Sequence, residues 1–272
     1  MFMIILLMVI LSAAAIYLLL TVCRTGHPDL PKLQSFVYAH RGLHGYGVPE
    51  NSIRAFQLAK EAGYGIELDV HLLADGNLAV IHDSLLLRTT GLSGRIEDLT
   101  TEQLKNCKLE GTDETIPTLQ EVLELYSGAA PLIVELKSDT KKNNQAMLAQ
   151  AACSMLENYN GLYCIESFDP RCVAWLRKNK PQIIRGQLSE DYLKNSVAIP
   201  WILAALLRNH LLNIWTYPDF VAYKFNQRNI LSNYICRKLW GGLGVAWTIS
   251  SQEDYDRAIQ EGWLPIFEGF RP

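Results

Sequence analysis

The chain has 272 residues, of which 49% are hydrophobic, so it can bury a full core in one large domain or two small ones. The formal net charge is −3 and no basic cluster stands out, which argues against a nucleic-acid partner because phosphate-backbone binding usually needs a basic face. The spacings of the six cysteines fit neither a zinc site nor a dense disulfide framework, so we expect reduced thiols.

Residues 2–22 contain no charged residue. As a helix rising roughly 1.5 Å per residue they would reach about 31 Å, enough to cross a hydrocarbon core. A cleaved signal peptide is the alternative, but no basic residue precedes the segment. We therefore predict a membrane anchor at 1–24 in a single-pass protein of the cell membrane. Arg24, Lys32 and Arg41 follow the segment, so the positive-inside rule places the rest of the chain in the cytoplasm.

Residues 25–35 include Gly, His and Pro and are predicted to form a linker. After the linker, eight short apolar runs alternate with segments of helical length. Continuous apolar runs indicate strands that are buried on both faces, as in a parallel sheet. We predict an α/β fold, a closed (β/α)8 TIM-type barrel over residues 36–272. Its strands are expected at residues 36–40, 65–71, 132–137, 162–168, 183–188, 219–223, 244–248 and 265–268.

Two helix starts can be read from capping residues. Asn51 is predicted to cap a helix at 52–62. Thr118 follows a proline and is predicted to cap a helix at 119–126.

The segment after the second strand, residues 72–116, is too long for an ordinary loop and is predicted to be a structured insertion. It begins with a hairpin signal at Asp75-Gly76. A two-residue loop would place His82 opposite Asp69, with Cβ atoms roughly 5 Å apart. A loop with an odd number of residues would turn His82 to the other face.

Carboxylates stand at the ends of two predicted strands. Glu67 and Asp69 are two residues apart and point the same way, and Glu135 occupies the same kind of position on the next strand. For any single residue the alternative is a solvated acid paired with a lysine. Together, three carboxylates directed into one barrel mouth would repel each other strongly without a cation. Oxygen ligands favour Mg²⁺, Ca²⁺ or Mn²⁺ over zinc.

Two histidines, His40 and His82, follow apolar runs as well. Each can exchange a proton near neutral pH. Cleavage of a phosphodiester needs a base for the nucleophile and an acid for the leaving alkoxide. Arg41 adds a planar fork that suits a phosphate oxygen. A lone histidine at a strand end is more often structural, but two beside a metal triad favour catalysis.

At this point the sequence resembles the glycerophosphodiester phosphodiesterase family, with similarity that extends over residues 36–272. The resemblance rests on an ordered series of motifs, and it weakens after residue 137. These motifs are Ala39-His40-Arg41-Gly42, Pro49-Glu50-Asn51-Ser52, Glu67-Leu68-Asp69-Val70, Asp75-Gly76, His82-Asp83, Arg88-Thr89-Thr90, Ile116-Pro117-Thr118-Leu119 and Val134-Glu135-Leu136-Lys137.

The resemblance implies a (β/α)8 barrel whose insertion after strand two carries a catalytic histidine. It also implies hydrolysis of glycerophosphodiesters to glycerol 3-phosphate and an alcohol, by attack of water or a neighbouring glycerol hydroxyl at phosphorus. The implied roles are general base and acid for His40 and His82, and ligands of one divalent cation, Mg²⁺ or Ca²⁺ with Mn²⁺ as a further option, for Glu67, Asp69 and Glu135. Phosphate or substrate binding would involve Arg41, Lys137, Glu50 and Trp247. The chain departs from the family pattern at its end, residues 266–272, which leaves the role of Glu268 undefined.

Residues 197–207 and 211–217 are unusually apolar, but each is too short to span a bilayer. One interpretation is a barrel helix that packs inward. The other is an interfacial patch with Trp201, Trp215 and Tyr217 at headgroup depth.

These observations predict a membrane-anchored, metal-dependent phosphodiesterase whose partners are its substrate and membrane lipid. The substrate can be a glycerophosphodiester or, if an apolar groove adjoins the mouth, a lysophospholipid, which would make the protein a lysophospholipase D. A lipid-binding barrel without turnover is the third alternative. The two histidines argue against it, because binding alone needs no proton-transfer groups.

Overall fold

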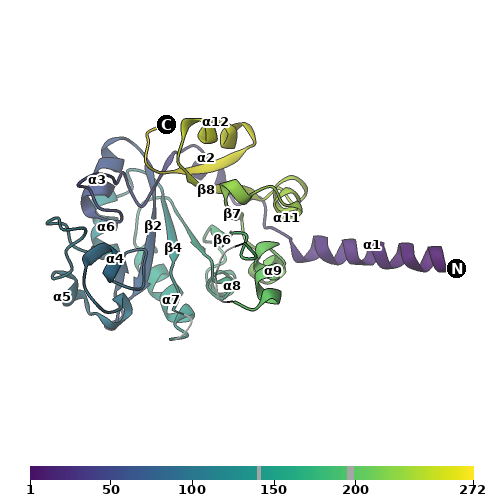
Figure 1. Cartoon of the computed structure of the whole chain (residues 1–272), viewed down its shortest axis with the longest axis horizontal. Coiled ribbons are helices and arrows are strands. Elements are labelled where there is room, and N and C mark those ends of the chain that lie inside the picture. The colour runs from purple at the N-terminus through teal and green to yellow at the C-terminus, as the bar shows by residue number, and fades with distance from the viewer. Residues whose placement is uncertain (140–141, 195–198) are drawn as a thin grey trace.

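A barrel of eight parallel strands forms the centre of the molecule (Figure 1). The structure is a computed structural model that describes residues 1–139, 142–194 and 199–272. Each barrel strand pairs with the next, and β1 pairs with both β2 and β9, which closes the ring. The barrel strands are β1 (Tyr38–His40), β2 (Gly65–Leu72), β4 (Leu132–Leu136), β5 (Tyr163–Ser167), β6 (Arg185–Ser189), β7 (Phe220–Lys224), β8 (Leu243–Ile249) and β9 (Trp263–Phe267). The predicted (β/α)8 barrel and its eight strands are confirmed.

Helices cover the outside of the barrel (Figure 1). The outward-facing strand residues pack with them into the larger core, which includes Ile66, Leu68 and Val134. The helices are α3 (Ile53–Glu61), α6 (Leu119–Tyr126), α7 (Gln145–Leu156), α8 (Pro170–Asn179), α9 (Trp201–Arg208), α10 (Asn213–Thr216), α11 (Leu231–Tyr234) and α12 (Gln252–Gln260), with a 3₁₀ turn η2 (Phe225–Gln227) and a π-helical turn η3 (Ile235–Leu239).

Alternate residues of the strands face the barrel interior, and they change from apolar to polar along each strand. At the N-terminal end the interior is filled by Tyr38, Ile133 and Ile266 among others. Two residues further along the same strands come His40, Glu135 and Glu268. Period-two alternation therefore gathers the polar side chains at the C-terminal ends of the strands, where barrel enzymes place their sites.

The caps were predicted correctly in one case and wrongly in the other. Thr118 caps α6 in a capping box with Glu121. Asn51 does not cap α3, because the hydroxyl of Ser52 accepts the hydrogen bond from the Ala55 N–H. Asn51 instead adopts a φ of 53° and donates from Nδ2 to Asp69, so it belongs to the site.

The insertion after β2 has a small core of its own around Leu73, Ile81 and Ile116. It contains β3 (Leu78–Val80), α4 (Leu87–Thr90), a 3₁₀ turn η1 (Ile96–Asp98) and α5 (Thr101–Leu104). β3 pairs antiparallel with β2 in a register that includes Val70 opposite Val80. The Leu73 N–H donates to the Asn77 carbonyl, which leaves three residues in the loop. The predicted two-residue hairpin loop is therefore wrong.

The N-terminal segment has two parts. α1 (Phe2–Leu20) stands away from the barrel with no buried residue, and its length and composition suit a membrane span or equally a signal sequence (Figure 1). The predicted linker contains α2 (Leu30–Gln34), whose Leu33 is buried among the interior barrel residues. α2 thus closes the N-terminal end of the barrel, opposite the polar end.

All six cysteines are free and buried, as expected for reduced thiols. Their burial, with no disulfide between them, means that the barrel is held together by packing and hydrogen bonds.

Candidate active site

Three buried carboxylates meet at the polar end of the barrel. Asp69 of β2 is in register with Glu135 of β4, and Glu67 lies two residues before Asp69 on the same face. One oxygen from each of the three carboxylates lies within 4.8 Å of the others. Burial and the charges of neighbouring carboxylates raise the pKa of Glu67 well above its ordinary value and that of Glu135 to about 7. The predicted triad is therefore assembled, and its charge is only partly balanced by protein groups.

Two cations lie against this triad. Lys137 Nζ is 3.0 Å from Glu135 Oε1 and 3.4 Å from Asp69 Oδ1. Arg41 Nε is 3.4 Å from Asp69 Oδ2. Burial opposes ionisation of Asp69, but the positive charge of Lys137, with smaller contributions from other cations, holds its pKa well below the ordinary value. Asp69 is thus the carboxylate most firmly kept ionised.

His40 faces the triad from β1. Its Nε2 is 3.7 Å from Glu67 Oε2, and its Nδ1 is hydrogen-bonded to the carboxylate of Glu268. That hydrogen bond, opposed by burial, lowers the pKa of Glu268 to about 2. Because a carboxylate accepts, Nδ1 carries the proton and leaves Nε2 free to accept one on the site side. The sequence left the role of Glu268 open, and the structure places it behind His40.

His82 reaches the same cavity from the insertion, although the hairpin loop has an odd length. β3 ends at Val80, so strand alternation no longer fixes the side chain two residues later. A ring nitrogen of His71 lies 3.1 Å from the His82 carbonyl, and His82 Nδ1 lies 2.7 Å from Asp83 Oδ1. The expectation that an odd loop turns His82 away is therefore wrong. Burial lowers the pKa of His82, although the charge of Asp69 opposes that shift.

The loop after β1 is tied to the insertion by a chain of ion pairs. Glu50 accepts hydrogen bonds from Arg41 at 3.0 Å and from Arg88 at 2.6 Å, and Arg88 also bonds to Asp83. The residue after Arg41 has to be a glycine. Gly42 has a φ of +81°, and a Cβ at this position would lie 2.8 Å from the backbone of Ala55. Glu50 thus orients Arg41 and connects it to the loop that carries His82.

The cavity enclosed by these residues has a volume of about 360 Å³. Trp247 lines it, with its ring edge-on to Phe168 at 5.5 Å between centroids. Among the described residues the buried Trp247 Nε1 has no hydrogen-bond partner, so it can donate to a ligand. Six of the nine residues predicted for the site line this cavity, and Asp69, Lys137 and Glu50 contact these lining residues from behind. The cavity residues are His40, Arg41, Glu67, His82, Glu135, Glu166, Phe168, Leu188, Glu190, Lys224, Trp247 and Ile266.

Glu166 is a site residue that the sequence interpretation missed. It is in register with Glu135 on the adjacent strand β5 and is buried. Burial and the charge of Glu135 raise its pKa well above the ordinary value, and its Oε2 lacks a partner within the described ranges. Its position at a strand end, two residues after the inward-facing Cys164, was the available signal.

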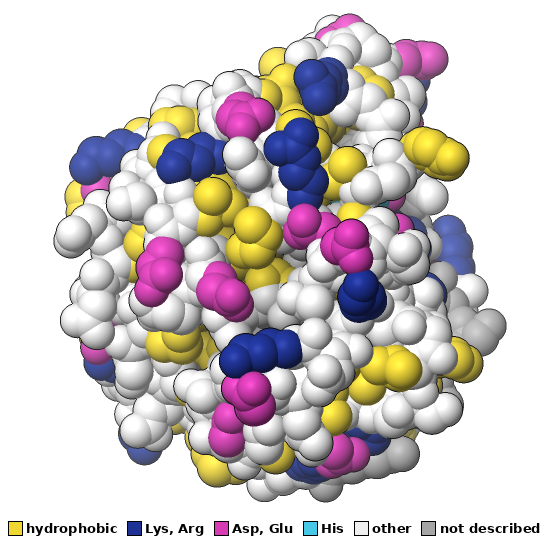
Figure 2. All heavy atoms as spheres, turned by 90° about the vertical axis from the view of Figure 1, so that its left-hand side faces the viewer, with side chains coloured by type: hydrophobic (Ala, Val, Ile, Leu, Met, Phe, Trp, Pro, Cys, Tyr) yellow, Lys and Arg dark blue, Asp and Glu magenta, His cyan; other side chains and the backbone are white. Residues whose placement is uncertain are grey.

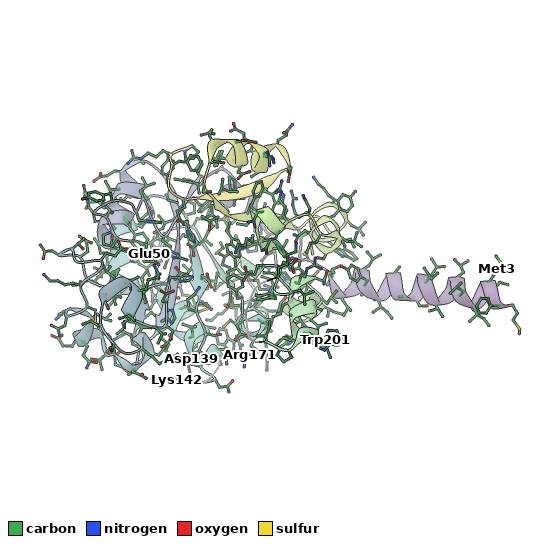
Figure 3. All side chains as sticks on the ribbon, viewed as in Figure 1. Met3, Glu50, Asp139, Lys142, Arg171 and Trp201 are labelled. Carbon is green, nitrogen blue, oxygen red and sulfur yellow. The ribbon has the colours of Figure 1, made fainter. Side chains whose placement is uncertain are left out.

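A second, larger cavity of about 1180 Å³ adjoins the first and shares His82 and Phe168 with it. We call it the apolar groove. It runs between the insertion, at Leu85 and Leu87, and helices α9 and α10, at Leu203, Leu207 and Trp215. In Figure 3, Asp139, Arg171 and Trp201 are labelled along this edge of the barrel, with Trp201 nearest to α1. A polar pocket with an apolar extension can accommodate a headgroup together with a hydrocarbon chain.

Known proteins from one family are similar to this chain. Residues 40–235 match the Glycerophosphoryl diester phosphodiesterase family. Over 245 residues the chain is 32% identical to a glycerophosphodiester phosphodiesterase of Caldanaerobacter subterraneus subsp. tengcongensis, with 85% of this chain and 92% of that protein covered. Over 261 residues it is 29% identical to glycerophosphodiester phosphodiesterase 1 of Homo sapiens, with 85% and 77% covered.

Solved structures share the fold. An Oleispira antarctica phosphodiesterase, in complex with the product sn-glycerol-3-phosphate, has a TM-score of 0.69 and 25% identity over 86% of this chain and 92% of that one. A glycerophosphodiester phosphodiesterase from Thermotoga maritima has a TM-score of 0.66 and 26% identity over 86% and 93%.

Proposed function

The chain belongs to the Glycerophosphoryl diester phosphodiesterase family, and on this basis we propose that it hydrolyses glycerophosphodiesters to glycerol 3-phosphate and an alcohol. The observation that carries the proposal is the cluster of three buried carboxylates between His40 and His82. A relative with the same fold holds glycerol 3-phosphate as its product. A cavity of about 360 Å³ at this cluster is large enough for a glycerol phosphate group.

The donor set fits one divalent cation held by Glu67, Asp69 and Glu135. The fit follows from the protein itself, because burial and mutual repulsion raise the pKa of both glutamates and an ion would relieve that repulsion. Three carboxylates without sulfur or imidazole suit Mg²⁺, Ca²⁺ or Mn²⁺. When bound, such an ion polarises phosphoryl oxygens and lowers the pKa of a coordinated hydroxyl.

The two histidines supply the proton transfers. His40, with Nδ1 turned to Glu268, takes a proton at Nε2 from the nucleophile, which is water or a glycerol hydroxyl next to the phosphate. The nucleophile's oxygen then bonds to phosphorus while the bond to the leaving oxygen breaks. His82 donates its proton to that oxygen, which departs as the alcohol. Attack by water gives glycerol 3-phosphate directly, whereas attack by the glycerol hydroxyl gives a cyclic phosphate, which water then opens to glycerol 3-phosphate with the two histidines in exchanged roles. Arg41 and Lys137 hold the phosphate oxygens from the carboxylate side of the cavity.

The direct test is an assay of purified protein with glycerophosphocholine. We expect equal amounts of glycerol 3-phosphate and choline in the presence of Mg²⁺ or Ca²⁺. The Glu67→Gln variant, which keeps the side-chain volume but removes a ligand charge, serves as the control. Production of phosphocholine and glycerol in place of glycerol 3-phosphate would contradict the proposed bond cleavage, and absence of turnover would favour the lipid-binding alternative.

A second candidate, lysophospholipase D activity, is favoured by the apolar groove. A soluble diester needs only the polar cavity, whereas an acyl chain needs an apolar extension, and the groove of about 1180 Å³ supplies one. Release of choline from glycerophosphocholine and from lysophosphatidylcholine, measured side by side, separates the two substrate classes.

A groove variant tests this second candidate. Leu87 lines the groove and is exposed, so Leu87→Asp should leave folding intact. Loss of its apolar contact is expected to raise KM for lysophosphatidylcholine by about tenfold, roughly 1.4 kcal/mol, with no change for glycerophosphocholine. Leu92→Asp is the matched control, because Leu92 is also an exposed leucine of the insertion but lies outside the groove. Equal effects on both substrates would argue against an acyl site.

Glu268 is expected to act through His40. Replacing it by Gln keeps the size of the side chain but removes the charge that fixes the His40 ring. We expect kcat to fall by about tenfold or more, with KM little changed, since Glu268 holds the base and does not reach the phosphate. Glu268→Asp should recover part of the activity. A loss that appears only in KM would assign Glu268 to substrate binding.

We propose, finally, that α1 is the membrane anchor of this enzyme, with residues 36–272 as its catalytic barrel. α1 is strongly apolar and none of its residues is buried, and residues 2–16 are exposed, so the described part of the protein offers no partner for these side chains. The basic residues that follow α1 favour a cytoplasmic barrel. Carbonate extraction of membranes from expressing cells tests the anchor, because a cleaved signal peptide would leave the protein in the soluble fraction.

A further inference from the structure

The base of α1 is fixed to the barrel by specific contacts. Trp240 donates from Nε1 to the Leu18 carbonyl at 3.1 Å, and the buried Cys236 thiol donates to the Thr21 carbonyl at 3.3 Å. Asn213 of α10 contacts the Cys23 sulfur at 3.6 Å. These contacts set the direction in which α1 leaves the barrel, so the surface around its base has a defined orientation to anything that α1 enters.

Further along, the chain is held again. Arg24 forms an ion pair with the buried Asp219, at the start of β7, and donates to the Ile183 carbonyl at 3.0 Å. The connection between α1 and the barrel is therefore short, and contacts with the barrel hold it at both of its ends, unlike a flexible tether.

Exposed apolar side chains surround this base on two sides. Figure 1 shows α9 and α11 flanking the end of α1. α10 contacts α1, and Cys236 of η3 contacts Thr21 at the end of α1. Trp201 is 74% exposed and Tyr234 is 64% exposed, which is unusual for large aromatic side chains. We call this surface the α1 collar. It comprises Trp201, Ile202, Leu203, Ile214, Trp215, Leu231, Tyr234 and Leu239.

Tyr217, which the sequence also suggested for an interfacial patch, does not belong to the collar. It is half-buried, and the guanidinium of Arg177 lies 5.1 Å from its ring centroid. Residues 195–198, at the start of the apolar segment, lie outside the described residues. We also considered an inward-packing helix at 197–207. Ala204 is the one buried residue of α9, so this helix packs against the barrel only in part.

We propose that the α1 collar is a second membrane contact, which rests in the interfacial region of the bilayer that α1 enters. A bilayer crossed by a fixed helix must face the surface around the base of that helix. Tryptophan and tyrosine are enriched at this depth, and the collar presents two tryptophans and a tyrosine among aliphatic side chains. The face opposite α1 differs, because Figure 2 shows charged side chains of both signs spread across it.

The position of the collar also determines which way the apolar groove opens. Leu203 and Trp215 belong to the collar and line the groove as well. A collar resting on the bilayer would therefore open the groove toward lipid, and an amphiphile could enter without first crossing bulk water. This consequence concerns access alone, and the membrane contact itself does not require the enzyme to be active.

The test uses the full chain reconstituted in phosphatidylcholine vesicles with bromine atoms on the acyl chains, which quench nearby tryptophans. The chain has six tryptophans, and α1 contains none. Trp240 is exchanged for phenylalanine in every variant, because it lies at the base of α1 and would report entry of that helix alone. In this background we expect strong quenching, and loss of most of it in the variant that also carries Trp201→Phe and Trp215→Phe. Phenylalanine keeps the apolar ring, so both folding and docking should persist while the reporters disappear. Trp175→Phe on α8 is the control and should leave the quenched fraction unchanged.

A second pair of variants tests the contact by disrupting it. Ile202→Glu with Ile214→Glu adds charge to the collar and is expected to halve, or further reduce, the quenching of Trp201 and Trp215. Met147→Glu is the matched control, because Met147 is 59% exposed on α7 and Ile202 is 56% exposed. Quenching that survives loss of both collar tryptophans, or that is insensitive to the charged pair, would overturn the proposal. Crosslinked dimers with unquenched collar tryptophans would instead assign the surface to a second copy of the chain.

Discussion

Replacing His82 with alanine is expected to lower kcat for glycerophosphocholine by about 100- to 10,000-fold, the usual contribution of a general acid or base. His82 lines the polar cavity and is the proposed donor to the leaving oxygen. The loss should appear in kcat more than in KM, because the proposed phosphate-binding residues, Arg41 and Lys137, are unchanged. The measurement is steady-state release of glycerol 3-phosphate at saturating substrate.

His40→Ala should lower kcat by a similar factor. The kcat of the double variant should be only slightly below that of the less active single variant, because the two groups act in one reaction. Titration calorimetry should show that metal affinity is nearly unchanged, because neither histidine belongs to the carboxylate triad. His27→Ala is the control, since His27 contacts Gln182 away from the cavity. Activity of His82→Ala within about twofold of the parent would remove His82 from the mechanism.

A substrate with a better leaving group distinguishes the roles of the two histidines. A nitrophenyl diester of glycerol phosphate needs little protonation of its leaving oxygen. If His82 is the acid, this substrate should restore much of the lost rate in His82→Ala but not in His40→Ala. Equal rescue of both variants would contradict the assignment of base and acid.

The strands and the principal site residues could be predicted from sequence for a simple reason. A strand buried on both faces gives a continuous apolar run, and a polar residue at its end marks the mouth of the barrel. Glu135 stands near such an end, Asp69 is in register with it, and Glu67 lies two residues before Asp69 on the same face. The three were identified correctly as neighbours. The same rule covers Glu166, which was missed because no charged partner follows it two residues later, where Glu135 has Lys137 and Glu166 has Phe168.

Positions outside the strands were predicted less well. The route of His82 into the cavity depends on where β3 stops and on a hydrogen bond from His71, and neither follows from residue spacing. Asparagine is common at helix N-caps, but here the next residue, Ser52, caps the helix, and Asn51 donates a hydrogen bond to Asp69. The apolar groove and the α1 collar combine residues far apart in the chain. Tertiary contacts decide all of these, so a local pattern cannot report them.

Removal of the divalent cation is expected to reduce hydrolysis by about a thousandfold or more, because a metal ion contributes several kcal/mol of charge stabilisation at the phosphoryl group. Dialysis against a chelator, followed by titration with Mg²⁺, Ca²⁺ and Mn²⁺, measures both the loss and the ion preference. Full activity in the metal-free protein would contradict the proposed cofactor.

The metal-free protein should also show an unusual pH dependence of stability. Burial raises the pKa of Glu135 to about 7, above its value in the unfolded chain. The folded state then binds more protons than the unfolded state between about pH 4.5 and 7, so linkage requires the free energy of unfolding to fall as pH rises through this range. The expected loss for this group is a few kcal/mol, because each tenfold difference in proton affinity between the two states corresponds to about 1.4 kcal/mol.

A bound cation should reverse that trend, since it favours the ionised carboxylates and stabilises the folded state by mass action. Thermal melts at pH 5 and pH 8, with and without metal, should therefore show a metal-dependent rise in Tm that is larger at pH 8. Glu135→Gln removes a titrating carboxylate and should flatten the pH dependence of the metal-free protein while weakening the response to metal. Lys137 would keep Asp69 as a partner at 3.4 Å, so the variant should fold. Identical melting curves for parent and variant under all four conditions would show that the three carboxylates do not share a cation.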